Sequence, residues 1–299
     1  MKIIYFSLLT ILMIPFLKIK AETDFRPANT LNIKMYGGTL TGSSYFDLNE
    51  QLIENLPYTP QNGLGSKNYT FDYMKYFLGL NAEYSVTDKF MVFLNVPTGY
   101  NTLKETYQSE FNIDSITKAD YSLFQIDYFG LGAKYLLYSK KAYMALSFES
   151  RIPHSFHHSI LNDPSYPFLS AGAFEFLPGV ILGLKLEKSW LETSIIYNIR
   201  ELELKNQILI HTEAGLSTIP DTKLKITADF IQSTSSFKYA VPFDPEKTIL
   251  QENIFRLGFG FSIFFTDRVY SEFSYNVSLL GKNSWNMSTF YLSTGMLIK

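Results

Sequence analysis

The chain has 299 residues, of which 46% are hydrophobic, 16% aromatic and 18% charged, with a formal net charge of −2 and no cysteine. So many apolar rings and so few charges exclude a disordered chain, and the lack of cysteine excludes disulfide scaffolds and thiol nucleophiles. The balanced charge argues against nucleic acid as a partner, and no nucleotide-binding glycine motif is present.

The first segment, residues 1–21, has the pattern of a secretory signal peptide. Lys2 gives it a basic start, an apolar run follows at 3–17, and a small residue precedes a polar stretch. The run is shorter than the roughly 20 apolar residues of a membrane-spanning helix, and Pro15 interrupts it. We predict that this segment is cleaved and that residues 22–299 form a single domain.

Beyond the signal peptide, apolar residues alternate with small or polar ones, which is the pattern of β-strands. In the clearest segment, Tyr76 to Tyr84, the even-numbered residues are apolar, whereas the odd-numbered residues include Gly79 and Glu83. The chain contains twelve such segments, at 30–41, 69–85, 90–98, 123–138, 142–152, 176–187, 190–200, 206–217, 223–232, 253–265, 269–280 and 287–298.

The connections between these segments alternate between tight turns and long polar loops. Tight turns such as 85–89 alternate along the chain with long predicted loops at 42–68, 99–122, 153–175 and 233–252. A soluble β-sandwich also alternates, but its outer face carries much more charge. The pattern predicts an all-β, up-and-down antiparallel transmembrane β-barrel, with twelve strands or, as alternatives, ten or fourteen.

A barrel of this kind belongs in the outer membrane of a diderm, Gram-negative-type bacterium. Its expected partners are outer-membrane lipid and lipopolysaccharide, a small solute and the outer-membrane barrel assembly machinery.

Charged residues gather on the side of each predicted strand that faces the lumen. The lumen-facing candidates are Glu83, Lys134, Glu149, Arg151, Lys185, Glu192, Arg200, His211, Glu213, Lys225, Asp229, Arg256 and Glu272. They either guide a solute or form a structural network of ion pairs, and any barrel excludes such charges from lipid. Because their signs alternate, we expect little charge selectivity.

The histidines raise the question of catalysis or metal binding. His154, His157 and His158 fall in one predicted loop, and His211 shares a strand face with Glu213. A hydrolase needs a hydroxyl nucleophile beside the imidazole, and no serine is tied to His211 in the sequence. We therefore predict no enzyme, no catalytic residue, no cofactor and no metal site, and leave an outer-membrane lipid hydrolase as a remote alternative.

Three stretches carry a family resemblance: residues 80–99, with a tight Asp turn and a strand ending in Pro97, the glycine-rich strand 127–135, and the hairpin 176–200. Together they resemble the outer-membrane barrels of phenol-degradation pathways (meta-pathway barrels), which are akin to the fatty-acid and toluene channels. The resemblance implies passive uptake of small, often apolar molecules. The predicted first strand lies close to the cleavage site, so the N-terminal hatch of the fatty-acid channels is not expected.

The leading functional hypothesis is an outer-membrane channel for small solutes, apolar or aromatic ones among them. The alternative is a surface protein whose long loops bind a partner. Pro97, Pro153 and Pro178 lie within or at the ends of predicted strands, where a missing backbone donor interrupts the hydrogen-bond ladder. They are candidates for a lateral gate, unless they merely end strands.

Overall fold

The structure is a computed structural model that describes residues 25–46, 50–53, 66–109, 116–154, 173–201, 205–234, 253–282 and 284–299. Its strands are β1 (Thr30–Phe46), β2 (Leu52–Ile53), β3 (Ser66–Ser85), β4 (Phe90–Ser109), β5 (Ile116–Ile126), β6 (Tyr128–Ser139), β7 (Ala142–Pro153), β8 (Glu175–Lys185), β9 (Ser189–Arg200), β10 (Gln207–Ile219), β11 (Thr222–Ser233), β12 (Asn253–Phe264), β13 (Val269–Lys282) and β14 (Ser284–Ile298). None of the described residues belongs to a helix long and apolar enough to cross a membrane.

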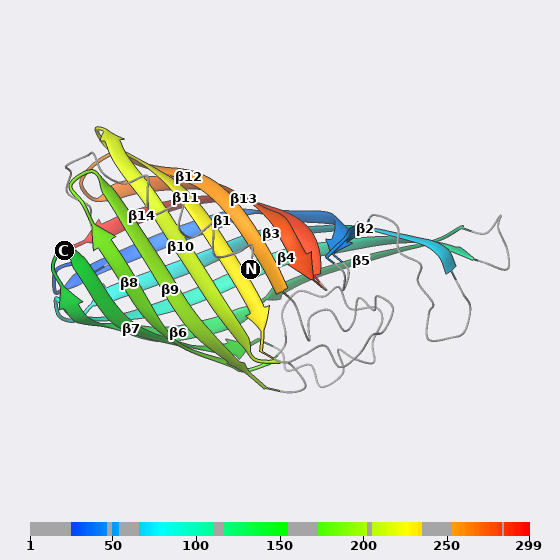
Figure 1. The fold of residues 1–299 in the computed structure, drawn as a ribbon, viewed down its shortest axis with the longest axis horizontal. Coiled ribbons are helices and arrows are strands. Elements are labelled where there is room, and N and C mark those ends of the chain that lie inside the picture. The colour runs from blue at the N-terminus through cyan, green and yellow to red at the C-terminus, as the bar shows by residue number, and fades with distance from the viewer. Residues whose placement is uncertain are drawn as a thin grey trace.

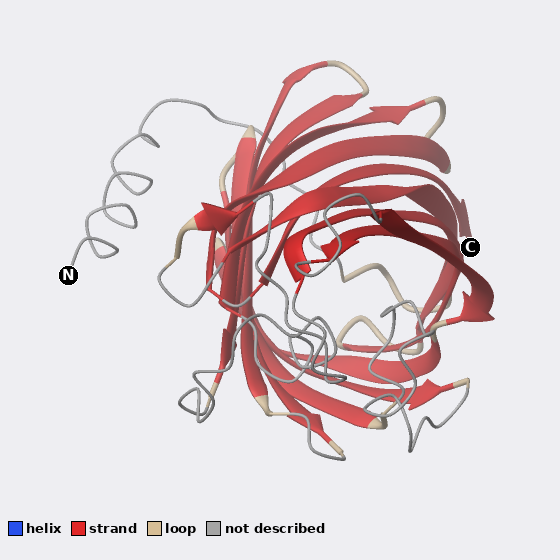
Figure 2. Cartoon of the chain, turned by 90° about the vertical axis from the view of Figure 1, so that its right-hand side faces the viewer, coloured by secondary structure: helices blue, strands red, loops and turns tan. Residues whose placement is uncertain are grey.

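The strands form a closed antiparallel barrel. Successive strands of the wall pair with each other from β1 to β14, and β14 returns to pair with β1, from Leu31–Ile298 to Phe46–Ser284. Figure 2 shows the strands as a ring. Leu31, at the start of β1, pairs with Ile298, at the end of β14. Both strand ends lie at the end of the barrel that carries the tight turns, which is the left end in Figure 1.

Strands β5 and β6 act as one strand of the wall, with a β-bulge between them. Both pair with β4, through Thr98–Ile126 on one side of the bulge and Asn95–Gly130 on the other. Between these two pairs, one more residue stands on the β5–β6 side than on β4, which defines a bulge around Asp127. The wall therefore has twelve strands, as predicted, and the short β2 is an addition at the rim of β1.

One predicted loop, 99–122, is wrong, because most of it is strand. β4 continues to Ser109 and β5 begins at Ile116, so that β3, β4 and β5 extend together beyond the barrel rim (Figure 1). On the outward face of this extension, Asp72 and Asp120 both lie opposite Lys104. A strand that has left the bilayer no longer needs apolar outward residues, so its sequence resembles that of a polar loop.

The outward face of the barrel is apolar. Leu80, Leu131, Leu182 and Phe259, which lie on the apolar faces of four different strands, are exposed by 39%, 53%, 40% and 55%. Exposed large hydrophobic side chains occur on every strand of the wall, far beyond the patches found on soluble monomers. With all wall strands hydrogen-bonded into a ring, this surface suits a hydrocarbon environment.

On the inner face of the barrel, large side chains lie over glycines of the adjacent strand. Tyr143 of β7 lies opposite Gly183 of β8, and a Cβ atom at position 183 would overlap the tyrosine ring. The ring passes over the glycine, and its hydroxyl donates a hydrogen bond to Glu192 of β9. Pairing a small with a large residue in this way lets side chains fill a narrow barrel and supports the glycine at the same time.

This packing generates a stability prediction. Gly183→Val should lower the free energy of unfolding by roughly 2 kcal/mol, because the added side chain overpacks against Tyr143. In the Tyr143→Ala background the same substitution should be tolerated, since the ring is gone. Urea unfolding followed by tryptophan fluorescence measures both effects. Equal losses in the two backgrounds would contradict the packing arrangement.

The strand order generates a prediction of orientation. Asp120 is exposed on the β3–β5 extension, and Lys140 is exposed in the tight turn between β6 and β7. In outer-membrane barrels the short turns face the periplasm. On intact cells a membrane-impermeant maleimide should therefore label Asp120→Cys and spare Lys140→Cys, and both should react after lysis. Labelling of Lys140→Cys alone on intact cells would reverse the orientation.

Candidate functional site: the polar inner face

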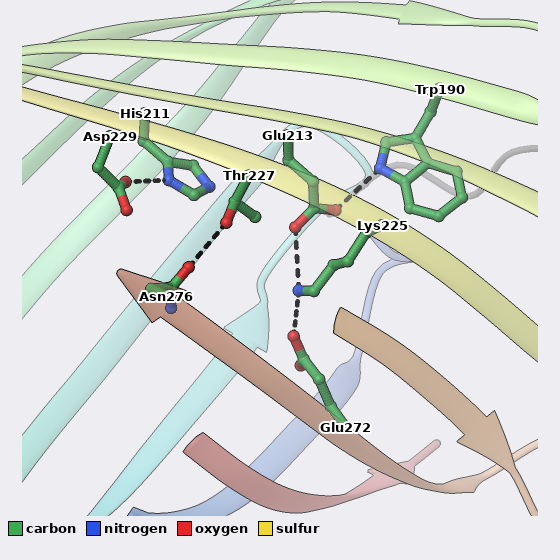
Figure 3. Close-up of polar contacts among 8 residues, drawn as sticks. All are labelled: Trp190, His211, Glu213, Lys225, Thr227, Asp229, Glu272 and Asn276. Carbon is green, nitrogen blue, oxygen red and sulfur yellow. Dashed lines mark hydrogen bonds and ion pairs between the residues drawn. The ribbon is translucent and has the colours of Figure 1, made fainter. Parts of the chain in front are cut away.

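The most connected group of inner polar residues spans β10 to β13 (Figure 3). Lys225 of β11 contacts Glu213 of β10 at an Nζ–Oε2 distance of 3.0 Å and also pairs with Glu272 of β13. To reach Glu272, the lysine crosses β12 at Gly260, where a Cβ atom would lie 3.1 Å from the lysine Cε. A side chain that bridges two strands separated by a third must lie on the concave face of the sheet.

Two further contacts extend this group. The indole Nε1 of Trp190 donates a hydrogen bond of 2.9 Å to Glu213. Thr227 donates one of 2.9 Å to the Asn276 side chain, passing over Gly258. These contacts satisfy polar groups on the inner face and link strands β9 to β13 from within the barrel.

His211 and Asp229 form a separate pair on the same side of the barrel. The histidine Nδ1 lies 2.6 Å from Asp229 Oδ1, and their side chains are 44% and 30% exposed. The side chains of the Lys225 group are 14–23% exposed, so the His211–Asp229 pair is the more accessible of the two. The His211–Asp229 pair and the Lys225–Glu213 pair both join inner-face positions of β10 and β11.

Lys75 and Asp127 form a buried ion pair behind the β-bulge. Their Nζ–Oδ2 distance is 2.5 Å, and their side chains are 11% and 9% exposed. Lys75 lies on β3 and crosses β4 at Gly99, where a Cβ atom would lie 2.5 Å from the lysine Cε. The pair therefore ties the bulge to a strand that does not adjoin it.

The remaining acidic residues of the inner face also lie in clusters. Arg151 contacts Glu149 and Glu175 at 3.0 and 3.4 Å. Glu83 contacts Arg26 at 2.8 Å and Lys134 at 3.9 Å. These clusters join strands β3 with β6, and β7 with β8, through the barrel interior.

The thirteen predicted lumen-facing residues all lie in described strands. Most of them are brought into ion pairs, including Glu149 with Arg151. Among the other four, Lys185 lies over the Tyr143 ring at 5.6 Å, Glu192 accepts a hydrogen bond from the Tyr143 hydroxyl, and Arg200 donates from Nε to the backbone carbonyl of Lys205 at 2.7 Å. The fourth, Arg256, makes no hydrogen bond or ion pair within the described part of the chain. Whether any of these residues meets a solute remains a prediction.

Sequence reasoning missed three charged members of these clusters: Arg26, Asp127 and Glu175. Arg26 precedes the first strand, and Glu175 begins β8 at the edge of a predicted loop. Asp127 lies at the bulge, where the alternation of inward and outward residues reverses. The sequence pattern therefore did not indicate which face of the sheet Asp127 is on.

A short segment before β1 also contributes to the interior. Phe25 packs against a buried cluster on β6, β7 and β8 formed by Leu136, Tyr143, Ala145 and Ile181. Since β3 and β4 lie between β1 and β6, the segment runs across the inner face at the turn end of the barrel. No N-terminal hatch was expected, yet these few residues cover part of the inner surface.

Of the histidine arrangements considered from the sequence, the structure describes only the one at His211. His211 contacts Asp229 rather than Glu213. His154 is the last described residue after β7, and His157 and His158 lie outside the described residues. Over the described ranges, no group of three or more metal-ligating side chains comes together. The predicted signal peptide also lies outside the described residues.

The three prolines occupy different positions in the wall. Pro97 is in β4 and Pro153 ends β7; both are buried and in register with inner-face residues. Pro178 is in β8 opposite the exposed Phe148, and so lies on the outward face.

The Lys225 cluster generates a prediction. Lys225→Met should lower the free energy of unfolding by about 3 kcal/mol, because it leaves two half-buried carboxylates without their shared cation. Adding Glu272→Gln should recover part of that loss by removing one of the stranded charges. Lys104→Met, on the outer face of the extension, is the control and should be nearly neutral. Urea unfolding in detergent measures all three. No recovery in the double variant would contradict the proposed coupling.

No protein-family model and no curated protein matches the chain. Among solved structures, the chain is similar to an outer membrane channel from Pseudomonas putida F1, with a TM-score of 0.63 and 12% identity, covering 93% of this chain and 99% of that one. More remote likenesses include the toluene transporter TodX from Pseudomonas putida (TM-score 0.42, 10% identity, 91% of this chain and 89% of that one) and the outer membrane protease OmpT from Escherichia coli (TM-score 0.36, 12% identity, 92% and 98%).

The first likeness confirms the predicted β-barrel fold; the other two are too distant to support an argument. Together with the apolar outward face and the closed hydrogen-bond ladder, it identifies the protein as a β-barrel of the bacterial outer membrane.

Proposed function

We propose that the protein is a passive channel for small solutes, with apolar or aromatic molecules as its substrates. A closed barrel with a polar interior supports a channel. The similar barrel from Pseudomonas putida F1 is itself described as an outer membrane channel. Ion pairs cross the interior and the Phe25 segment covers part of its surface, so an apolar solute needs a route that avoids a full passage through a narrow, charged lumen.

The observation that carries this proposal is an interruption of the wall at Pro178. The β8–β9 ladder has the pairs Phe176–Ile199 and Gly179–Ile196, with no pair at positions 177 and 178. Proline lacks the N–H group that a ladder requires. The outward surface around it is apolar, since Phe148, Phe176 and Tyr197 are all exposed. A lateral exit at Pro178 would release an apolar solute directly into lipid.

Pro97 and Pro153 are weaker candidates for a gate. The bulge opposite Pro97 is held by a hydrogen bond of 2.9 Å from the Asp127 N–H to the Pro97 carbonyl. The Lys75–Asp127 ion pair fixes the same place from the inside. Pro153 ends β7 at the loop end of the barrel, where a strand has to stop in any case. Of the three predicted gate residues, Pro178 is therefore the one that we assign to the exit.

The proposal is tested with Pro178→Val. The valine N–H can restore one ladder hydrogen bond, and we expect uptake of an aromatic hydrocarbon into proteoliposomes to slow about fivefold, the effect of one bond of about 1 kcal/mol. Pro220→Val, in the tight turn before β11, is the matched control and should leave uptake unchanged. Equal uptake by Pro178→Val and wild type, with equal folding, would remove the lateral exit. Uptake no faster than in empty liposomes would contradict the channel itself.

A second function, binding of a partner at the cell surface, is favoured by one observation. The β3–β5 extension stands beyond the barrel rim and presents Asp72, Lys104 and Asp120 on its outward face. A protein that serves only to bind a partner would not make liposomes permeable. The same uptake assay therefore separates the two functions.

A further inference from the structure

The carboxylates of the inner face are already engaged by donors. Each of the eight that the structure describes there contacts a basic side chain or accepts a hydrogen bond from a side-chain hydroxyl: Glu83, Asp127, Glu149, Glu175, Glu192, Glu213, Asp229 and Glu272. A cationic solute in the lumen would have to displace one of these partners. Although the inner-face charges alternate in sign, the carboxylates already have protein partners and are therefore less available to a solute.

Arg256 is the exception among the basic residues of β10 to β13. It lies on β12, opposite Asp229 of β11 and Ser278 of β13. Within the described part of the chain its guanidinium makes no hydrogen bond or ion pair, and its Nε is buried without a partner. Leaving a buried donor unpaired normally costs about 1–3 kcal/mol, so this arrangement calls for an explanation.

The explanation lies in how Asp229 is oriented. Asp229 is the nearest acidic neighbour of Arg256 in register, but its Oδ1 lies 2.6 Å from His211 Nδ1 (Figure 3). The histidine thus holds the carboxylate that would otherwise neutralise the arginine. Arg256 is left as a half-buried cation beside the accessible His211–Asp229 pair.

We propose that Arg256 is an anion-binding subsite of the lumen, and that it takes the carboxylate of a small organic acid. A guanidinium matches a carboxylate through two parallel hydrogen bonds, and partial burial strengthens the attraction. His211 acts as a positioning residue, because it keeps Asp229 away from the guanidinium. The proposal rests on the proposed function in that the lumen must admit the solute, and it replaces the expected lack of charge selectivity with a preference for anions.

The subsite is tested first by binding, which does not require transport. Benzoate should bind the detergent-folded barrel in a calorimeter, whereas benzyl alcohol, which lacks the charge, should bind more weakly. Arg256→Gln should weaken benzoate binding about tenfold, the loss of charge-assisted hydrogen bonds. Lys104→Gln removes a positive charge outside the lumen and should leave the binding unchanged. Equal affinity of Arg256→Gln and wild type for benzoate would overturn the subsite.

The positioning role of His211 has its own signature. In His211→Ala the freed Asp229 should turn to Arg256 and weaken benzoate binding, although the arginine is intact. Adding Asp229→Asn should restore that binding, because the competing carboxylate is gone. A merely structural role for His211 predicts no such rescue. If the double variant binds as weakly as His211→Ala while remaining folded, the positioning role is wrong.

Ion selectivity in planar bilayers tests whether the subsite lies on the passage. Under a KCl gradient the wild type should favour chloride, and Arg256→Gln should lose that preference. A wild type that binds benzoate through Arg256 but carries no current would contradict passage through the lumen and leave the subsite standing. A wild type that conducts ions but does not bind benzoate would support passage through the lumen and contradict the subsite.

Discussion

Within the hydrocarbon of a bilayer, every backbone N–H and C=O must find its partner inside the protein. The pairing of β1 with β14 meets this requirement, because it removes the two free edges that an open sheet would expose to lipid. The consequence is a cylinder of twelve strands, whose interior is narrower than that of the larger water-filled porins. The rest of the structure follows from filling such a cylinder while its outside remains apolar.

Filling it depends on glycines placed beside long side chains. Where Lys225 meets Gly260 and Lys75 meets Gly99, a side chain crosses an entire strand and pairs with a charge on the strand beyond. These contacts join strands that share no backbone hydrogen bonds. They therefore brace the ring from within, and they bring each charge into contact with a partner in a space that excludes most water.

The sequence pattern was sufficient for the strands and for their two faces, because the alternation with period two depends only on lipid outside and protein inside. It failed where this contrast ends. The extension of β3, β4 and β5 beyond the rim has polar outward residues such as Asp72 and Asp120, so it resembled a loop. The bulge at Asp127 shifts the register by one residue, and a single extra residue leaves no mark in composition.

Partners within the barrel were harder to predict than faces. His211 shares a face with Glu213, two residues away, yet its contact is Asp229 on the next strand. Which residues lie opposite each other depends on the stagger between strands, which is a property of the closed ring and not of any one segment. Glu149 and Arg151, by contrast, form an ion pair within one strand, where their spacing of two residues alone places them on the same face.

The wall shows how a barrel compensates for a proline. At Pro97 the missing N–H is accompanied by a bulge, and the Asp127 N–H bonds the proline carbonyl while the Asp127 carboxylate pairs with Lys75. At Pro178 the neighbouring strand keeps its register, and two successive ladder positions have no pair. The first proline lies on the inner face, where polar side chains are at hand to compensate. The second lies on the outward face, where the neighbours are apolar and have no group to offer, so the interruption persists where the wall meets lipid.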